Sequence, residues 1–240
     1  MMHIKQVTLL AEKYPTDKRY PFNLDIFHKT KSIEFHSPVT FFIGENGTGK
    51  STLLEALSHK CGIHIWRNGM RSRFEHNPYE QALFNFLLIE WTNGFVPGSF
   101  FAAEIFTNFA QNLDEWAATD PGQLKYFGGK SLMTQSHGQS LMSFFRSRYK
   151  IKGLYFLDEP ETALSPKSQL ELVNLLTEMG RDGHAQFIIA THSPILLACP
   201  EAVIYSFDHV PVQRIGYEET EYFRLYRDFM ADRERFLSKS

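Results

Sequence analysis

The sequence lacks the features that mark secreted and membrane-spanning proteins. Its 240 residues include only two cysteines, Cys61 and Cys199, in no metal or redox spacing, which argues against a disulfide scaffold. No apolar run approaches the roughly 20 residues that span a bilayer, and the start of the chain has no signal-peptide pattern. We therefore expect a cytoplasmic protein with two buried, reduced thiols.

Strong charge and internal repetition are also lacking. The formal net charge is −2, so attraction to nucleic acid or to a membrane surface would have to be local. The sequence has no repeats, no low-complexity linker and no heptads long enough for a coiled-coil arm. With 43% hydrophobic and 22% charged residues, it has the composition of an ordinary globular protein. We expect a single compact domain over residues 1–240.

Apolar segments that alternate with amphipathic ones predict an α/β fold with a mostly parallel sheet. Strands are expected at 3–10, 32–35, 39–43, 63–66, 99–103, 154–157, 186–191 and 202–207. Helices are expected after residue 50, over 104–116, from about 141, after the Ser165–Pro166 pair and over 222–229. Residues 79–90 fit a helix and a strand equally well.

The first candidate site is a glycine-rich loop between a predicted strand and a predicted helix. Residues 44–51 read GENGTGKS, the form G-x-x-x-x-G-K-[ST]. Glycines let backbone N–H groups surround phosphates, and the helix N-terminus adds its positive dipole end. Lys50 would reach the β- and γ-phosphates, and Ser51 would hold Mg²⁺. The nucleotide-binding residues expected here are Gly44, Glu45, Asn46, Gly47, Thr48, Gly49, Lys50, Ser51 and Thr52. The alternative is a glycine-rich turn that binds nothing.

The second candidate site is a pair of acids, Asp158 and Glu159, after the apolar strand 154–157. Ligands of open parallel sheets bind at the carboxyl ends of the strands, so Asp158 would share Mg²⁺ with Ser51. Glu159 is placed to polarise an attacking water. The alternative is an ordinary solvated acid near a turn. Two adjacent acids indicate hydrolysis rather than storage of the nucleotide.

Two further motifs complete a recognisable order. Residues 136–140 read SHGQS and precede a predicted helix, and residues 191–194 read THSP and end the strand after the acids. In this order the chain resembles the ATP-binding-cassette ATPase superfamily. Within it, the soluble SMC/RecF-like branch and small stand-alone AAA-type ATPases are the most similar. The resemblance covers nearly the whole chain: Walker A at 44–51, Walker B at 154–159, the signature motif at 136–140, the D-loop at 163–165 and the switch histidine at His192.

The resemblance implies a fold and a mechanism. The fold would be an ABC-type ATPase head, with an N-terminal antiparallel β part and a small helical signature lobe over about 66–150. ATP and Mg²⁺ would be the cofactors, and two heads would form an ATP-dependent homodimer around two nucleotides. Lys50, Glu159 and His192 would act on the nucleotide of their own chain. Ser136, Gly138 and Gln139 of the partner would close over its γ-phosphate.

Some positions depart from the family pattern. His137 stands where the signature usually has glycine, and the Q-loop glutamine has no clear counterpart. Glu104, at the end of the 99–103 strand, is the expected third Mg²⁺ ligand, with Gln81 and Gln111 as alternatives. The aromatic residue that stacks on adenine would be Tyr20 or Phe22, unless both only pack in the core.

Three classes of function remain open for the ATP cycle. The first is a soluble ATPase in DNA repair or defence that acts on nucleic acid or on an effector protein; residues 159–166 and 191–194 resemble this group. The second is the cytosolic subunit of a membrane transporter, which the unmatched Q-loop weakens. The third is a nucleotide-gated scaffold with little turnover. Two basic clusters would contact phosphates or simply face solvent: Arg67, Arg71 and Arg73, and Arg146, Arg148, Lys150 and Lys152.

Overall fold

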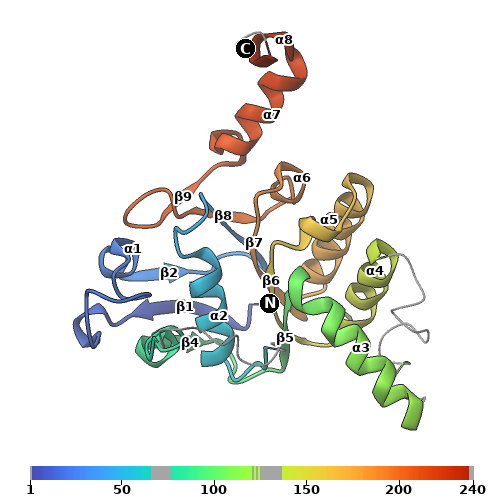
Figure 1. Cartoon of the computed structure of the whole chain (residues 1–240), viewed down its shortest axis with the longest axis horizontal. Coiled ribbons are helices and arrows are strands. Elements are labelled where there is room, and N and C mark those ends of the chain that lie inside the picture. The colour runs from blue at the N-terminus through green and yellow to red at the C-terminus, as the bar shows by residue number, and fades with distance from the viewer. Residues whose placement is uncertain (1, 66–76, 121, 123, 125–136, 238–240) are drawn as a thin grey trace.

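The computed structural model describes residues 2–65, 77–120, 122, 124 and 137–237 (Figure 1). Its centre is a six-stranded sheet in the order β5-β6-β7-β3-β8-β9. These strands are Gly98–Ala102, Gly153–Asp158, Ala185–Ala190, Val39–Ile43, Val203–Ser206 and Gln213–Ile215. The first five run parallel, and β9 pairs antiparallel with β8. The predicted mostly parallel sheet is therefore confirmed.

A second, antiparallel sheet has the order β2-β1-β4. It consists of Ser32–Glu34, Ile4–Leu9 and Leu87–Trp91. A fully buried carboxamide, that of Gln186 in β7, joins the two sheets. Its oxygen accepts from the backbone N–H groups of His3 and Ile4 at 2.6 and 2.9 Å, and its nitrogen donates to the carbonyl of Ile4 at 3.1 Å. The N-terminal antiparallel part expected from the family resemblance is confirmed.

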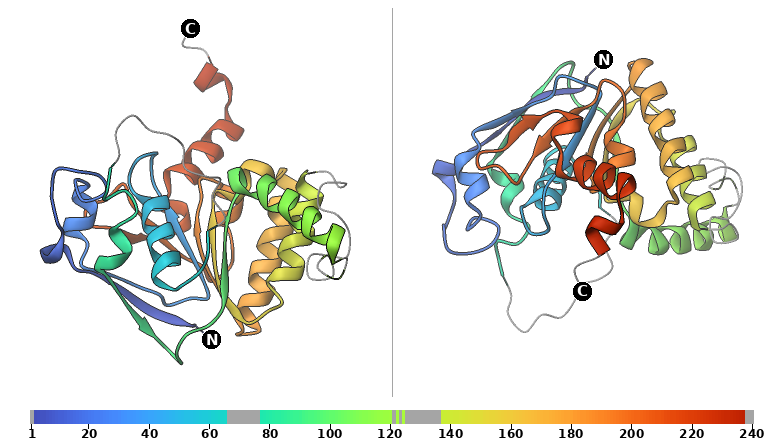
Figure 2. Two further views of the ribbon diagram at one scale, coloured as in Figure 1. Left: turned by 60° about the horizontal axis from the view of Figure 1, so that its bottom comes forward. Right: turned by 90° about the horizontal axis from the view of Figure 1, so that it is seen from above.

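Helices cover both faces of the six-stranded sheet (Figures 1 and 2). On one face, α2 (Lys50–Lys60) packs between this sheet and the antiparallel one. On the other face lie α3 (Ala103–Thr119), α4 (His137–Arg148) and α5 (Pro166–Arg181). Successive side chains of a strand point to opposite faces of the sheet. Phe42 therefore lies in the core on the α2 side, and Phe41 lies in the core on the side of α3, α4 and α5. All five residues of β3 are buried, as a central parallel strand requires.

Shorter elements complete the fold. They are α1 (Asp25–Lys29), α6 (Pro194–Leu197) and the 3₁₀ turns η1 (Ala11–Lys13), η2 (Leu83–Phe86), η4 (Pro160–Ala163) and η5 (Tyr217–Glu219). As predicted, Ser165 caps α5, because its hydroxyl accepts from the N–H of Ser168. Among the described residues, no helix has both the length and the apolar character that crossing a membrane requires.

The chain ends in a projecting arm, which we define as α7 (Glu221–Ala231) and α8 (Glu234–Leu237). The arm stands away from the body (Figures 1 and 2). The predicted helix at 222–229 is confirmed. Most of its apolar side is uncovered, however, with these large apolar side chains exposed along the arm: Leu225, Tyr226, Phe229, Met230, Phe236 and Leu237.

Two local predictions were wrong and one ambiguity is resolved. Residues 63–65 form no strand, because they turn back onto the end of α2, where the N–H of Ile63 bonds the carbonyl of Ser58. Ile63 and Ile65 are buried without a strand partner, so burial alone produced the alternating pattern. Helix α4 begins at His137 rather than near residue 141. Residues 79–90 divide into η2 and most of β4. The single-domain assignment and the 66–150 lobe stay predictions.

Candidate active site

The glycine-rich loop joins β3 to α2 at the carboxyl edge of the central sheet. Its backbone enters the left-handed region at Gly44, Gly47 and Gly49, where φ is 142°, 86° and 102°. A Cβ atom on Gly49 would lie 2.8 Å from Cζ of the buried Phe27. Position 49 therefore requires glycine both for its φ and for its space. Helix α2 starts at the next residue, Lys50, so its free N–H groups face the loop.

Lys50 is a buried cation held inside this loop. Its Nζ donates to the carbonyl oxygens of Gly44 and Glu45 at 2.6 and 2.9 Å. Burial lowers the pKa of Lys50, and the nearby carboxylates of Glu159 and Asp208 act in the opposite direction. Neutral carbonyls are weaker partners for an ammonium group than phosphate oxygens. A phosphate group can thus replace them around Lys50 at a gain.

Asp158 and Ser51 form the part of the site that fits Mg²⁺. Asp158 ends β6, and the Ser51 hydroxyl donates to its Oδ1 at 2.9 Å. Burial raises the pKa of Asp158 to about 7, so its negative charge lacks full compensation. Within the described part of the chain, no group of three or more His, Cys, Asp or Glu side chains could hold a metal ion. A single carboxylate with a hydroxyl suits Mg²⁺, which takes its remaining ligands from water and phosphates.

Glu159 and His192 meet beside these groups. The backbone of Glu159 is left-handed, with φ 44° and ψ 53°, and its N–H bonds the carbonyl of Ala190 at 2.9 Å. This conformation costs on the order of 1–3 kcal/mol in a non-glycine residue and is often found at active sites. His192 follows β7, and its Nε2 lies 3.4 Å from Oε1 of Glu159. That Nε2 atom is buried and has no hydrogen-bond partner among the described residues.

The structure does not bring Gly138 and Gln139 of the signature motif to the phosphate loop of the same chain. Gly138 and Gln139 lie in the first turn of α4, on the opposite face of the sheet from α2. They line a small hollow of about 280 Å³, together with Ser168 and the Arg146–Glu171 ion pair. Ser136 lies outside the described residues. The roles of all these residues stay predictions.

Other predicted residues fall into two groups. Glu104 lies in the first turn of α3, directly after strand β5, whose Ala102 is opposite Asp158. This location suits a metal ligand, although the Glu104 side chain lies outside the described part of the structure. Phe22 is fully buried in the core and cannot stack on a base. Tyr20 is exposed, and its hydroxyl bonds that of Thr52, which keeps it a candidate.

Two residues of the second basic cluster are bonded within the protein. Arg146 pairs with Glu171, and an Arg148 guanidinium N–H donates to the carbonyl of Gly98 at 2.8 Å. Both residues thus make contacts within the protein. Arg67, Arg71 and Arg73 lie outside the described residues.

Three site residues were missed by the sequence reasoning. Asp208 follows β8, and its Oδ1 accepts from the N–H of Glu45 at 2.7 Å; the rule for strand ends would have found it. The carboxylate of Glu161 accepts from the N–H of His192 at 2.6 Å, and burial raises its pKa. Tyr222, in α7, contacts both His192 and Gly44. Its sequence signal is an apolar helical stripe, which does not distinguish a site residue from a packing residue.

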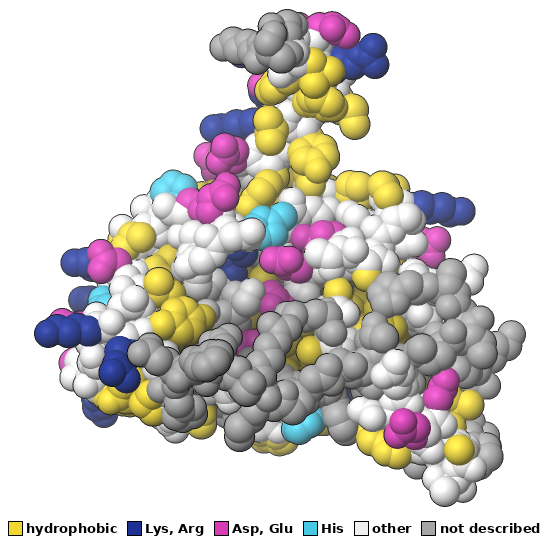
Figure 3. Space-filling view, in the orientation of Figure 1, with side chains coloured by type: hydrophobic (Ala, Val, Ile, Leu, Met, Phe, Trp, Pro, Cys, Tyr) yellow, Lys and Arg dark blue, Asp and Glu magenta, His cyan; other side chains and the backbone are white. Residues whose placement is uncertain are grey.

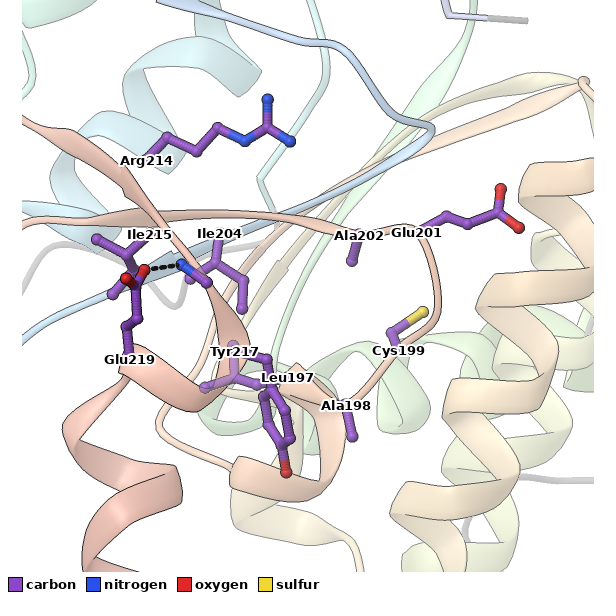
Figure 4. Close-up of a pocket in the computed structure, with 11 residues that line it drawn as sticks. Leu197, Ala198, Cys199, Glu201, Ala202, Ile204, Arg214, Ile215, Tyr217 and Glu219 are labelled. Carbon is purple, nitrogen blue, oxygen red and sulfur yellow. Dashed lines mark hydrogen bonds between the residues drawn. The ribbon is translucent and has the colours of Figure 1, made fainter.

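A larger cavity lies away from these residues. It has a volume of about 710 Å³ between the α6–β8 connection and the segment from β9 to η5 (Figure 4). Cys199, Arg214 and Tyr217 are among its lining residues, and none of the predicted site residues lines it. Burial raises the pKa of the Cys199 thiol, which makes it a poor nucleophile. The candidate active site is therefore the polar carboxyl edge of the sheet.

Comparisons with known proteins agree with this geometry. Residues 22–62 match a family model described as "AAA domain", and residues 141–198 match "AAA domain, putative AbiEii toxin, Type IV TA system". No curated protein sequence matches the chain significantly.

Solved structures show the same fold at low sequence identity. The structure of cbiO1 from Clostridium perfringens, part of the ABC transporter complex cbiONQ, is 20% identical with a TM-score of 0.50, and the match covers 98% of each chain. The SmcHead bound to the C-winged helix domain of ScpA is 12% identical with a TM-score of 0.52, covering 89% of this chain and 98% of that one. The two partial matches are thus both to AAA-domain models, and the solved structures share the fold of this chain.

Proposed function

We propose that this chain hydrolyses ATP and works as a head that dimerises around two ATP molecules. One observation carries the proposal. Lys50, Ser51, Asp158, Glu159 and His192 converge at the carboxyl ends of three adjacent strands, β6, β7 and β3. The ATPase-domain matches support nucleotide binding and hydrolysis in general. The roles of the individual residues and the dimer are our inference.

The chemistry assigns one task to each side chain. Lys50 would leave the loop carbonyls and bind the β- and γ-phosphates. Ser51 and Asp158 would hold Mg²⁺, which supplies charge neutralisation on the phosphates. Glu159 would accept a proton from the water whose oxygen attacks the γ-phosphorus, as the bond to the bridging oxygen breaks. His192, as the imidazolium with a hydrogen on both ring nitrogens, would donate from Nε2 to a γ-phosphate oxygen.

A second copy of the chain would complete the site. Gly138 and Gln139 are on the opposite face of the sheet from α2, so they are better placed for another molecule's nucleotide than for their own. The N-terminus of α4, a helix of 12 residues, would then point its dipole at that γ-phosphate.

The cycle would serve DNA repair or defence through an effector protein or nucleic acid. The partial match to the model described as "AAA domain, putative AbiEii toxin, Type IV TA system" supports a role in defence. A membrane partner is the weaker alternative. One structural neighbour is part of a transporter complex, but at 20% identity this similarity shows only a shared fold. Affinity purification from native cells would separate them: a membrane protein that co-purifies contradicts the proposal, and a soluble effector or nucleic acid agrees with it.

The substitution Glu159→Gln tests the chemistry and the assembly together. We expect ATP to bind, its hydrolysis to slow at least about 100-fold, and light scattering to show a dimer only with ATP and Mg²⁺. The matched control is Glu178→Gln, at an exposed position on α5, which should keep wild-type turnover. Wild-type turnover in Glu159→Gln would show that Glu159 is not the general base. An unchanged monomer mass with and without ATP would contradict the dimer.

A further inference from the structure

Tyr222 connects the first turn of the arm to the candidate active site. Its hydroxyl donates to the carbonyl of Gly44 at 3.1 Å and lies 2.7 Å from Nδ1 of His192. The two rings meet edge to face, with centroids 5.4 Å apart and an interplanar angle of 89°. Burial, with the nearby charges of Asp208 and Glu45, raises the pKa of Tyr222 to about 12. The phenol therefore stays neutral near pH 7.

The hydrogen-bond roles determine which nitrogen of His192 faces the site. A carbonyl oxygen can only accept, so we assign the single phenol hydrogen to Gly44. The phenol oxygen then accepts, and Nδ1 of His192 must carry the hydrogen between them. Nε2 is buried without a hydrogen-bond partner in the described structure and lies 3.4 Å from Oε1 of Glu159. In the neutral ring with its hydrogen on Nδ1, Nε2 could only accept, whereas in the imidazolium both nitrogens donate. The contact with a γ-phosphate oxygen therefore requires the imidazolium, with Nδ1–H bonded to Tyr222 and Nε2–H left for the phosphate.

We infer that Tyr222 is a positioning residue, which holds the His192 ring so that Nε2 points at the γ-phosphate. This inference rests on the proposed ATPase function. It also makes the first turn of α7 a working part of the site rather than only the root of a projecting arm. Such an outer partner of a histidine fixes the ring orientation and the protonated nitrogen, as in other sites where a second group orients an imidazole.

Anchoring of the arm does not account for the two polar contacts of Tyr222. Thr220 caps α7, because its buried hydroxyl accepts from the N–H of Phe223 at 3.2 Å and donates to the carbonyl of Tyr217 at 2.7 Å. Tyr217, one turn earlier, donates its hydroxyl to the carbonyl of Pro194 at 3.1 Å and packs against Phe223. These contacts attach the arm to the body without Tyr222.

The experiment compares Tyr222→Phe with Tyr217→Phe. Each removes one hydroxyl that bonds a backbone carbonyl and leaves the ring, but only Tyr222 contacts His192. For Tyr222→Phe we expect kcat to fall about tenfold and KM to change less than about twofold, because the phosphate contacts of Lys50 remain. For Tyr217→Phe we expect both constants to stay at the wild-type values.

Histidine ¹⁵N NMR of the nucleotide-free protein supplies a readout that does not need turnover. The His192 signals are assigned by their loss in His192→Asn. In Tyr222→Phe the Nδ1–H signal should shift or disappear, whereas Tyr217→Phe should leave it in place. Unchanged kcat and an unchanged Nδ1 signal in Tyr222→Phe would overturn the inference. If the wild type hydrolyses no ATP, the proposed function fails, while the NMR result still decides whether Tyr222 orients His192.

Discussion

The carboxyl edge of the central sheet and the C-terminal arm depart from the usual pattern of burial in opposite ways. At the edge, polar groups are buried: Lys50 bonds loop carbonyls, and Asp158 bonds Ser51. On the arm, apolar groups are exposed: Met230 is 78% exposed and Leu237 is 60% exposed. Figure 3 shows hydrophobic side chains along the arm and acidic and histidine side chains on the body below it.

The difference indicates which kind of partner would stabilise each region. Buried charges are costly unless they are paired. The proposed ligands, phosphate groups and a cation, would therefore stabilise the edge by pairing its charges. Exposed apolar side chains cost the isolated chain little stability, and they add stability only when another surface covers them. Tyr222 joins the two regions, since it lies in α7 and bonds Gly44. The edge is therefore strained without its ligand, whereas the arm is not.

The largest expected effect is at the edge, for Asp158→Asn. We expect ATP hydrolysis to fall at least about 100-fold, because the side chain that we propose as a Mg²⁺ ligand loses its charge. The nucleotide-free protein should become more stable, by on the order of 1–3 kcal/mol, because a buried and poorly compensated charge is removed. The asparagine oxygen still accepts from the Ser51 hydroxyl. Steady-state ATPase assays and urea unfolding measure the two effects.

The control for this prediction is Asp208→Asn. Asp208 also accepts at the edge, from the N–H of Glu45, but it is exposed. Its substitution should leave the free energy of unfolding within about 0.5 kcal/mol of the wild type. A less stable Asp158→Asn protein would mean that the edge is not strained without its ligand, which would contradict the comparison with the arm.

The next effect is on the loop backbone, for Gly49→Ala compared with Gly47→Ala. Both glycines have positive φ, but a Cβ on Gly47 meets nothing within 4 Å, whereas one on Gly49 lies 2.8 Å from Phe27. We expect Gly49→Ala to lower the free energy of unfolding by about 2–4 kcal/mol. Gly47→Ala should lower it by about 1 kcal/mol, through backbone strain alone. Urea unfolding followed by circular dichroism gives both values, and equal losses would show that Phe27 can move aside.

The sequence predicted the parts of the site that depend on local chemistry and on strand ends. Asp158 ends a strand of the parallel sheet, and the phosphate loop, Glu159 and His192 follow strands of the same sheet. The carboxyl ends of such strands share one edge. The site role of Tyr222 was not predictable, because its partner Gly44 is 178 residues away. The start of α4 was placed too late, because residues 136–140 were predicted to precede the helix, which in fact includes His137.

Periodicity also could not tell a covered helix from an uncovered one. The apolar stripe of α5, with Leu172 and Leu176 fully buried, has the same spacing as Leu225 and Phe229 in α7. A hydrophobic stripe predicts that a surface exists to cover the helix, but not that this surface belongs to the same chain. The helix at 222–229 was therefore predictable from the sequence, whereas the exposure of its apolar side was not.

The smallest effect is expected on the arm, and it is the test of that difference. Leu225→Ser removes an apolar side chain that is 49% exposed, whereas Leu176→Ser removes one that is 0% exposed. We expect Leu225→Ser to change the free energy of unfolding by no more than about 0.5 kcal/mol, the helix-propensity cost of serine. Leu176→Ser should cost about 3–5 kcal/mol, because it leaves a cavity and buries a hydroxyl. Urea unfolding of the two variants at low protein concentration, without nucleotide, gives both numbers. A loss above about 2 kcal/mol for Leu225→Ser would mean that the arm packs against the body in solution. In that case the apolar stripe of the arm would be part of the core, and the contrast between an exposed apolar arm and a buried polar edge would not hold.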